Sequence, residues 1–514
     1  MQSASIRHAL KGATAAVVLA AVALLLGLVT PPDDYRASGA TLLDAVEQAR
    51  AGDGSQWSGP TLPGQVLAVA LSSSDAEGFG QLASVNAFLT AAATGAIAWL
   101  GFVFGGWLGC AAAFGAFLIW PSTLYHARNA GPEAVITLAW TLLLWAGTLR
   151  FKKTFGIIAA TIAFAFAAAT WHEAVWLIIP WVIATHFVAD LPDPRGTGGT
   201  FAIGTVAIGK LQLAHLVVAI AGPLLAFSLW PHLADDFGKR LIAILYEPLK
   251  AQHAPILVAG EIHDQAISRA PGFADGLLVV VIRTPLTLGA LAVVGALRAV
   301  RGIRIRDIVT RHLCFPLLGL AALLLIIGLN GSPFYAGIDG MAPLGPFVAL
   351  LAAVGFAGVM AAAQSSEKRW LSWAVALALL VPATADRVLH FGSEPSYHSP
   401  IVGSARGAAA LGFELRPTAS LPVDLVAWMN DHLPTNAELA IYPSEDRYRP
   451  LLDRLTRDGL LRADIKTASA YHGTHLLVPE HPAYPLFDDR VRTAGHPIAT
   501  IAVDGTLLLT LYKY

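Results

Sequence analysis

Two adjacent carboxylates, Asp33 and Asp34, follow the first apolar segment of the chain, within the run PPDDYR at 31–36. The apolar stretch from about 9 to 29 is long enough to cross a bilayer, and the two prolines cannot continue its helix. The acids therefore emerge at a membrane surface, where one could act as a general base, or the pair could bind a divalent cation such as Mg²⁺ or Mn²⁺. A turn with solvated acids is the alternative, but the C-terminal end of a helix disfavours negative charge. We expect Asp33 and Asp34 to be functional.

A second group lies in the run HARNAGPE at 126–133, just before another apolar segment. The forked donors of Arg128 suit a phosphate group. Pro132 is typical of the first turn of a helix, and Glu133 beside it suits the positive end of the helix dipole. The dipole alone could explain Glu133, so a structural role and a substrate-binding role both stay open for it.

Three further groups of ionisable residues fall between apolar segments. The first is a tight junction near Trp171, where charge at membrane depth is costly unless it faces a cavity, and the alternative is a turn in interfacial water. The second is a long polar segment around 261–269, which could equally be an ordinary solvated loop. The third is a short polar segment that contains Tyr335 and Asp339. The candidate substrate-binding residues of these groups are His172, Glu173, Glu261, His263, Arg269 and Tyr335.

The composition indicates an integral membrane protein. Hydrophobic residues make up 55% of the 514 residues and charged residues only 13%, against about 25% charged in soluble proteins. A net charge of −1 argues against a nucleic-acid partner, which needs a clustered basic surface. The two cysteines provide no disulfide framework. The first apolar segment is long for a cleaved signal peptide, and we expect a retained signal-anchor helix.

About eleven apolar segments have lengths near the twenty residues that a bilayer needs. Basic clusters near 150–153, 298–306 and 368–369 all fall on the side of the N-terminus, which the positive-inside rule makes cytoplasmic. The predicted fold is an α-helical polytopic membrane protein. After the first segment, the others lie at about 80–104, 107–122, 132–149, 154–170, 171–189, 203–230, 276–298, 309–329, 343–363 and 371–386.

The opposite, outer face receives the remaining polar segments. In the loop 30–79, a helix from Ser38 to about Arg50 and a short apolar piece at 62–71 are predicted as interfacial helices. The composition becomes ordinary from 387, so we divide the chain into a transmembrane domain, 1–386, and a small extracytoplasmic α/β domain, 387–514. This second domain contains no catalytic motif. Its helices are predicted at 423–432 and 447–458, and its strands at 438–442, 475–478, 498–503 and 506–511.

These features together resemble the GT-C superfamily of multi-spanning glycosyltransferases, in particular dolichyl-phosphate-mannose–protein mannosyltransferases and the bacterial aminoarabinose transferases of lipid A. Four features carry the resemblance: the acidic pair beyond the first span, an outer loop with interfacial helices, the run ARNAGPE, and the run WHEAVWLIIP at 171–180. In architecture the resemblance covers about residues 10–385. It implies no particular subfamily.

The resemblance implies an inverting glycosyltransferase, a multi-pass protein of the plasma (inner) membrane. Such an enzyme moves a sugar from a polyprenyl-phosphate carrier to a lipid, glycan or protein acceptor on the outer face. By analogy, Asp33 or Asp34 is the general base, Arg128 stabilises the departing lipid phosphate, and His172 and Glu173 position donor or acceptor.

This chain departs from the mannosyltransferase pattern in two respects. Those enzymes typically have Asp-Glu where this chain has Asp-Asp, which leaves open which acid is the base. The large β-trefoil insertion of the eukaryotic enzymes is missing, so a protein acceptor is not implied. Because some members of the superfamily use a divalent cation and others do not, no metal ligand is assigned.

Two other classes of function compete with the transferase. A transporter or flippase would place ionisable residues along a substrate path, but transporters commonly carry inverted repeats and broken helices at midplane depth. Here the charges gather at one surface and no repeat is visible. A scaffold whose soluble tail recruits a partner leaves the acidic pair and Arg128 unexplained. The transferase is the hypothesis that we take to the structure.

Overall fold

The computed structural model describes most of the chain. The described residues are 2–30, 34–50, 78–149, 154–170, 172–189, 200–203, 206–228, 256–263, 273–305, 307, 310–330, 339–364, 369–391, 393–413, 415, 420–441, 445–468, 473–479, 495–503 and 506–513.

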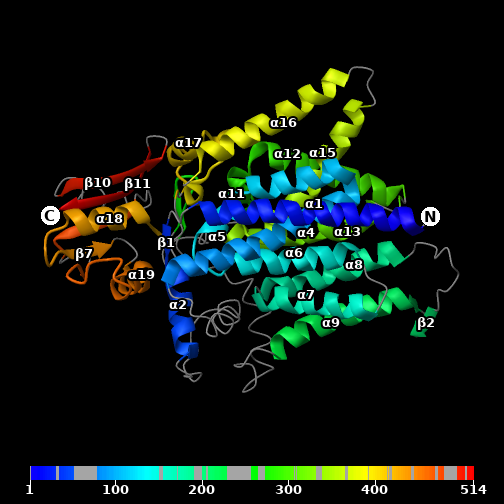
Figure 1. Ribbon diagram of the computed structural model, residues 1–514, viewed down its shortest axis with the longest axis horizontal. Coiled ribbons are helices and arrows are strands. Elements are labelled where there is room, and N and C mark those ends of the chain that lie inside the picture. Colours follow the sequence, from blue (N-terminus) through cyan, green and yellow to red (C-terminus); the bar gives the residue numbers. More distant parts are fainter. Residues whose placement is uncertain are drawn as a thin grey trace.

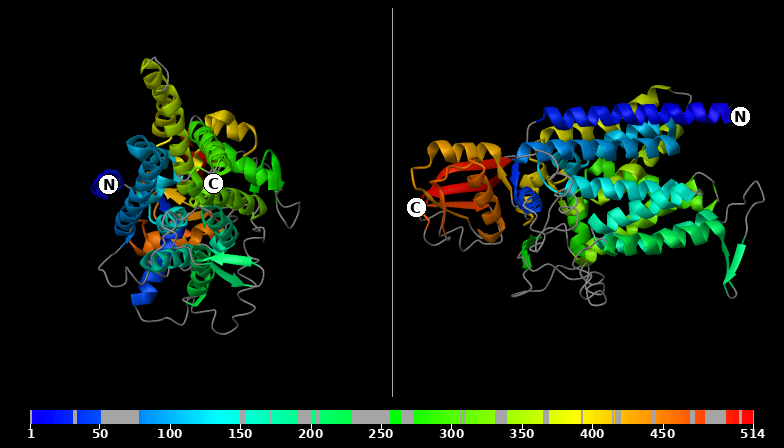
Figure 2. Two further views of the ribbon diagram at one scale, coloured as in Figure 1. Left: turned by 90° about the vertical axis from the view of Figure 1, so that its right-hand side faces the viewer. Right: turned by 60° about the horizontal axis from the view of Figure 1, so that its bottom comes forward.

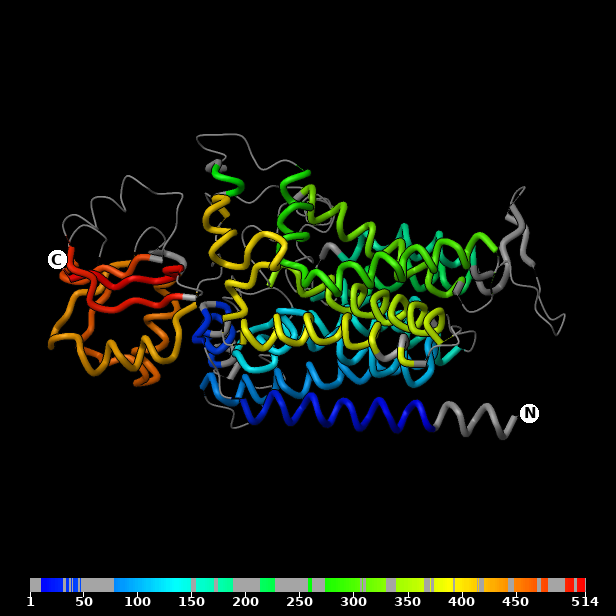
Figure 3. Tube along the Cα trace, turned by 90° about the horizontal axis from the view of Figure 1, so that it is seen from above, coloured from blue at the N-terminus to red at the C-terminus, as the bar shows by residue number. Residues whose placement is uncertain are grey.

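Long helices run side by side in one bundle, and a small sheet domain lies beyond one end of it (Figure 1). The N-terminus is at the opposite end of the bundle from this domain, as the views in Figures 2 and 3 also show. The described part of the chain is therefore a polytopic helical bundle with a C-terminal sheet domain, as predicted.

Five described helices are long and apolar enough to cross a membrane: Lys11–Val29, Gly78–Ile119, Leu286–Arg304, Arg311–Leu329 and Leu344–Gln364. Four shorter apolar helices accompany them. Each predicted apolar segment overlaps a helix of the bundle. These helices are α1 (Gln2–Val29), α4 (Gly78–Ile119), α6 (Glu133–Leu149), α7 (Thr154–Thr170), α8 (Ile178–Ala189), α9 (Lys210–Ser228), α12 (Leu286–Arg304), α13 (Cys314–Asn330), α15 (Leu344–Gln364) and α16 (Arg369–Leu389).

Helix boundaries follow the helix-breaking residues. Helix α4 contains both predicted segments 80–104 and 107–122, and Gly106 interrupts it with φ 59° and ψ −145°. The single span predicted at 276–298 is instead two helices, α11 (Phe273–Arg283) and α12. Pro285 separates them, because proline lacks an N–H donor and disfavours helical backbone in the residue before it.

The start of the span predicted at 203–230 is also corrected. Strands β2 (Thr200–Ile203) and β3 (Val206–Gly209) form an antiparallel hairpin, and helix α9 begins only at Lys210. The hairpin strands are rich in β-branched and aromatic residues, which favour extended backbone. Apolar composition alone did not separate this hairpin from the helix that follows.

Helix α15 lies at the centre of the bundle, where most of its residues are buried. It packs closely against α12 at Gly295 and Gly355. A Cβ atom added to Gly355 would lie 2.0 Å from the carbonyl oxygen of Leu291. Small residues let two backbones approach in this way, and such contacts are typical of membrane helices, where lipid provides no hydrophobic drive for association.

The C-terminal domain has a five-stranded sheet in the order β10-β11-β9-β7-β8. Strand β7 pairs in parallel with β8 and β9, and β11 pairs antiparallel with β9 and β10. The predicted helices and strands of this segment are confirmed, with shifts of one to two residues at their ends. The elements are α18 (Val423–His432), β7 (Glu438–Ile441), α19 (Glu445–Arg457), β8 (Lys466–Thr467), β9 (His475–Pro479), β10 (His496–Val503) and β11 (Thr506–Lys513).

Two contacts join the sheet domain to the chain that follows α1. Strand β1 (Asp34–Arg36) pairs antiparallel with β6 (Ser420–Pro422). Helix α2 (Ala37–Arg50), the predicted helix of the first outer loop, packs against α19. Its described apolar side chains Ala40, Leu42 and Leu43 are buried in one core with α18, α19 and the start of α4. Protein therefore covers these side chains, while the second predicted helix, at 62–71, lies outside the described residues.

Candidate active site

The first catalytic candidate lies on strand β1. Asp34 and Arg36 are 4% and 1% exposed, whereas Tyr35 between them is half-buried. Side chains of a strand alternate between its two faces, so the aspartate and the arginine point to the same side. Pairing with β6 holds the strand in place, with Asp34 opposite Pro422 and Arg36 opposite Ser420. The end of the first span is thus anchored by the C-terminal domain.

Helix α5 (Pro121–Arg128) packs against the buried face of β1. Proline at its first position pre-organises the first turn. The Tyr125 hydroxyl donates to Asp34 Oδ2 at 3.1 Å, and Asn129 Oδ1 accepts the Asp34 backbone N–H at 3.1 Å. Asn86 on α4 donates to the carbonyl oxygens of Asn129 and Gly131, both at 2.9 Å. These bonds fix the turn between α5 and α6 relative to Asp34.

Arg36 joins two acids that are distant in sequence. Its guanidinium makes two parallel 2.8 Å bonds to Glu133, the first residue of α6, and a third bond to Asp339 of η6 (Asp339–Met341). His126 Nε2 lies 2.7 Å from the other oxygen of Asp339. Gly131 leaves room for the pair, since a Cβ there would lie 2.2 Å from a Glu133 oxygen.

The charges in this network stabilise one another. Burial disfavours the charged form of Arg36, but the charges of Asp339 and Glu133 outweigh it and raise the pKa of Arg36 above its usual value. Burial likewise disfavours the Asp339 carboxylate, yet the Arg36 charge and the His126 hydrogen bond keep the pKa of Asp339 below its usual value. Arg36 and Asp339 are therefore an ion pair at neutral pH.

A second charged cluster surrounds Glu394, which lies in η7 (Glu394–Ser396) and is fully buried. Arg128 Nη2 and Arg387 Nη2 both donate to Glu394 Oε1, at 2.6 and 2.7 Å. The Arg128 guanidinium also stacks on the ring of Phe391, 4.2 Å from its centroid. Two cations thus share a single carboxylate oxygen, in a place that water does not reach.

The segment after α16 adds further buried polar groups to this cluster. The Tyr397 hydroxyl donates to Asp386, and burial together with that carboxylate raises the pKa of Tyr397. His398 is fully buried, and burial and the nearby Arg283 charge lower its pKa to about 3. Both side chains are therefore neutral at pH 7.

Helix α5 connects an acidic region and a basic region. On one side, Asp34, Glu133 and Asp339 surround Arg36; on the other, Arg128 and Arg387 share Glu394. Both regions lie between the end of the bundle and the sheet domain, where β1 and α5 are labelled in Figure 1. The arrangement offers a carboxylate to a group that loses a proton and cations to a group that carries negative charge.

The structure brings together part of the predicted site. Asp34, Arg128 and Glu133 are buried and bonded as described, and Asp339 joins them. His172 lies with Glu173 in η2 (His172–Leu177), and Glu261 lies with His263 in β5 (Glu261–His263), but their side chains are outside the described part of the structure. Asp33, Arg269 and Tyr335 lie outside the described residues altogether.

Several residues of the site were not predicted. Arg36 stood next to the acidic pair without an assigned role, and the Glu394 cluster was missed because the segment after 386 was attributed to the soluble domain. A signal was present: residues 394–400 read EPSYHSP, a dense polar run directly after the last apolar segment. The missed residues that make the contacts described above are Arg36, Asn86, Tyr125, Asp386, Arg387, Glu394, Tyr397 and His398.

No group of three or more His, Cys, Asp or Glu side chains within the described residues is arranged to hold a metal ion. The cation site considered for Asp33 and Asp34 cannot be assembled from them, because Asp33 lies outside. Asp34 itself accepts a hydrogen bond from Tyr125.

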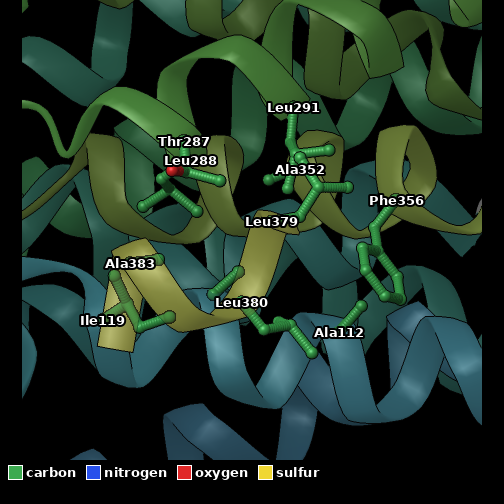
Figure 4. A pocket seen from close by; sticks show the side chains of 11 residues that line it. Ala112, Ile119, Thr287, Leu288, Leu291, Ala352, Phe356, Leu379, Leu380 and Ala383 are labelled. Carbon is green, nitrogen blue, oxygen red and sulfur yellow. The ribbon is translucent and has the colours of Figure 1, made fainter. Parts of the chain in front are cut away.

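An apolar pocket lies between α4, α12, α15 and α16 (Figure 4). Its lining includes Ile119 on α4, Leu288 on α12, and Leu380 and Ala383 on α16. Its volume of about 30 Å³ is close to the space of one water molecule, so it marks loose packing between helices. Ala383 lies one helical turn before Arg387, and residues four apart share a helix face. Apolar surface therefore leads along α16 towards the basic cluster.

Comparison with solved structures finds two of ArnT from Cupriavidus metallidurans, one bound to undecaprenyl phosphate and one in the apo state. Each is 13% identical in sequence, and the match covers 96% of this chain and 97% of the ArnT chain. The TM-scores are 0.45 for the lipid-bound structure and 0.49 for the apo structure. No protein-family model and no curated protein sequence matches the chain.

Proposed function

We propose that this chain transfers a sugar from a polyprenyl-phosphate carrier to an acceptor hydroxyl at the outer face of a membrane. One observation carries the proposal: helix α5 contacts a buried carboxylate, Asp34, and ends in an arginine, Arg128, that belongs to a buried basic cluster. Glycosyl transfer from a lipid phosphate needs both groups, one for the proton that leaves the acceptor and one for the charge that develops on the phosphate.

Asp34 serves as the general base. As the acceptor oxygen bonds to the anomeric carbon, its proton passes to the Asp34 carboxylate. The bond between that carbon and the phosphate oxygen breaks, and its electron pair leaves with the lipid phosphate. Attack opposite the leaving group inverts the anomeric centre. The Tyr125 hydroxyl orients the carboxylate, and Asn129 holds the Asp34 backbone through its N–H, as a base in a positioned reaction requires.

Arg128 and Arg387 receive the lipid phosphate. Guanidinium groups bind phosphate oxygens through parallel N–H donors, and in a buried site these interactions are stronger than in water. Their stabilisation increases as the phosphate gains charge in the transition state, which is the condition for catalysis rather than mere binding. The exposed apolar side chains of α16 before Arg387, which include Leu380 and Val381, suit the first part of an isoprenoid tail.

Arg36 has a positioning role. Its bonds to Glu133 and Asp339 tie β1 to α6 and η6, so the strand that carries Asp34 is held against α5. We assign no direct contact with the reacting atoms to Arg36, Glu133 or Asp339, because their charges already satisfy one another.

A transporter or flippase remains the competing function. Its substrate path would need ionisable groups along the depth of the bundle, whereas the two charged clusters described above lie together at one end. The proposal includes a location in the plasma membrane. It also includes an orientation in which the end of the bundle with both charged clusters faces the outer side.

The test is transfer activity of the purified full-length protein with a polyprenyl-phosphate sugar donor. Replacing the base, Asp34→Asn, should lower the turnover by about 10²- to 10⁴-fold, the usual contribution of general-base catalysis, while donor binding is retained. Asp33→Asn, made in parallel, tests which of the adjacent acids takes the proton.

Asp424→Asn is the matched control, because this exposed acid follows β6, the pairing partner of β1. It should leave the turnover unchanged. Wild-type turnover in both Asp33→Asn and Asp34→Asn would exclude the base assignment, and failure of the wild-type protein to bind any polyprenyl phosphate would exclude the function.

A further inference from the structure

The carboxylate of Glu394 occupies a position between two arginines that suits an anionic ligand. Its Oε1 atom accepts from both Arg128 and Arg387, at 2.6 and 2.7 Å. Its Oε2 atom is buried and has no hydrogen-bond partner among the described residues. Charged groups in a protein interior are costly unless their hydrogen-bonding capacity is filled, and here it is only half filled.

The hydrogen-bonding capacity of Arg387 is also only partly filled. This residue is 8% exposed, and its Nε and Nη1 atoms are buried with no hydrogen-bond partner among the described residues. The lipid-phosphate product is a phosphate monoester with up to three acceptor oxygens, so it offers acceptors to the Arg387 atoms that Glu394 leaves without a partner. The sugar donor is a phosphodiester, whose two free oxygens and single negative charge can take the place of the Glu394 carboxylate.

The two arginines and the glutamate lie on separate segments. Arg128 ends α5, where its Nε donates to the Leu124 carbonyl oxygen at 3.3 Å and its guanidinium stacks on Phe391. Arg387 lies in the last turn of α16. Glu394 lies in the short helix η7, after the turn that ends α16. A shift of η7 alone would thus free both guanidinium groups without unfolding either helix.

We propose that Glu394 is an internal counter-ion that holds the phosphate position while the site is empty and that the phosphate of the lipid substrate displaces. The proposal rests on the proposed function, which places the lipid phosphate at Arg128 and Arg387, and adds a regulatory residue to it. Glu394 keeps the arginines ordered and neutralised between turnovers. It competes with the donor on binding and with the lipid-phosphate product before release, so it lowers the affinity for both.

This role and a purely structural ion pair have opposite consequences for binding. If Glu394 is only a structural ion pair, the Glu394→Gln variant is less stable and binds the phosphate more weakly. If Glu394 is a competitor, the neutral variant binds the phosphate more tightly, because the ligand no longer has to displace a charge. A ligand shifts such an equilibrium only by its differential interaction with the two states, so the sign of the change decides between them.

The experiment measures binding of undecaprenyl phosphate to the purified full-length protein, with undecaprenol as the uncharged probe. Glu394→Gln should lower the dissociation constant of the phosphate about tenfold or more and leave that of the alcohol unchanged. Asp458→Asn is the control. It removes the same charge from a carboxylate that also pairs with an arginine, Arg454, but in the sheet domain outside this cluster, so phosphate affinity should change less than about twofold.

A double-mutant cycle then tests whether the gain in phosphate affinity depends on Arg387. In an Arg387→Gln background, the gain from Glu394→Gln should be largely lost, because one of the released guanidinium groups is absent. If Glu394→Gln does not yield folded protein, Glu394→Asp serves instead. Its shorter side chain withdraws from the arginines and keeps the charge, and it should tighten phosphate binding by a smaller factor.

The outcomes separate this proposal from the function on which it rests. Wild-type binding of the phosphate over the alcohol, with unchanged or weaker binding in the folded Glu394 variants, overturns the counter-ion role and leaves the transferase intact. Equal gains in Glu394→Gln and Asp458→Asn overturn it as well, since a general change in potential would then explain both. Lack of preference for the phosphate over the alcohol in the wild-type protein overturns both proposals.

Discussion

Arg36 and Arg128 are both 1% exposed, yet their surroundings differ in the sign of the charge that is in excess. Arg36 contacts two carboxylates, Glu133 and Asp339. Arg128 shares one carboxylate with Arg387. Arg36 between two acids acts as a brace. In the other cluster, the Nε and Nη1 atoms of Arg387 have no hydrogen-bond partner among the described residues, so this cluster retains the capacity to bind a further anion. The residue type alone does not distinguish these roles.

His398 provides a prediction on pH at the residue scale. Burial and the Arg283 charge lower the pKa of His398 from its usual value of about 6.5 to about 3, so folding favours the neutral ring. The stability that this contributes is complete above pH 6.5 and is lost progressively as the pH falls from 6.5 towards 3. His398→Gln should therefore make the thermal midpoint less dependent on pH within this window.

The control for this prediction is His432→Gln, at an exposed position on α18 where the ring stacks on Trp428. Thermal unfolding of the purified protein between pH 4 and pH 8 provides the measurement. A midpoint with the same pH dependence in wild type and His398→Gln would show that protonation of this ring does not limit stability.

Among the elements of the fold, α2 and α19 couple the outer loop to the C-terminal domain. Arg454 on α19 contacts Asp44 at 3.1 Å and Glu47 at 2.8 Å, both on α2, and it also pairs with Asp458. Arg457 contacts the same two acids of α2. Because α2 follows β1 directly, these contacts help to hold the strand that carries Asp34.

The two arginines differ in burial, and this difference predicts different effects. The Arg454 side chain is 5% exposed and that of Arg457 is 53% exposed. Arg454→Ala should cost more than about 1 kcal/mol, because buried bonds to charged groups are lost. Arg457→Ala should cost less than about 0.5 kcal/mol, as is usual for exposed ion pairs.

Limited proteolysis of the purified protein measures the release of the C-terminal domain from α2. Cleavage should be faster in Arg454→Ala and near the wild-type rate in Arg457→Ala. Equal cleavage rates in the wild-type protein and both variants would show that the apolar contacts of Ala40, Leu42 and Leu43 hold α2 without help from the ion pairs.

For the whole molecule, the proposed orientation in the membrane rests on the positions of the charged clusters and the basic segments. Helix α6 begins at Glu133 in the site and spans 17 residues to Leu149, about 25 Å along its axis. The basic residues predicted to face the cytoplasm follow that distant end. The proposal therefore requires the site and the sheet domain to lie outside.

Cysteine labelling of intact cells with a membrane-impermeant maleimide tests this orientation. Asp431→Cys, exposed on α18, should react, whereas Thr154→Cys, exposed at the start of α7, should react only after permeabilisation. The native Cys110 and Cys314 are buried, so their background is low. The reverse labelling pattern would place the site in the cytoplasm and exclude transfer on the outer face.

Most helices and strands of this protein follow from local sequence patterns. The apolar segments predicted the helices of the bundle, and helix α18 lies where its pattern predicted it, because helix formation depends on neighbours within a few residues. The two predicted spans that differ from the structure also have local causes. Pro285 divided one predicted span, and a β-hairpin before Lys210 shortened another.

The pairing of the charged residues, in contrast, depends on the three-dimensional fold. Arg36 pairs with Glu133 and Asp339, which are 97 and 303 residues away, and Arg128 pairs with Glu394, 266 residues away. Sequence periodicity contains no information about such partners, because they are brought together by the packing of helices that are apolar and similar in composition. Asp34 was predicted from its position after the first span. The arginine pair around Glu394 became visible only once α5, α16 and η7 were placed side by side.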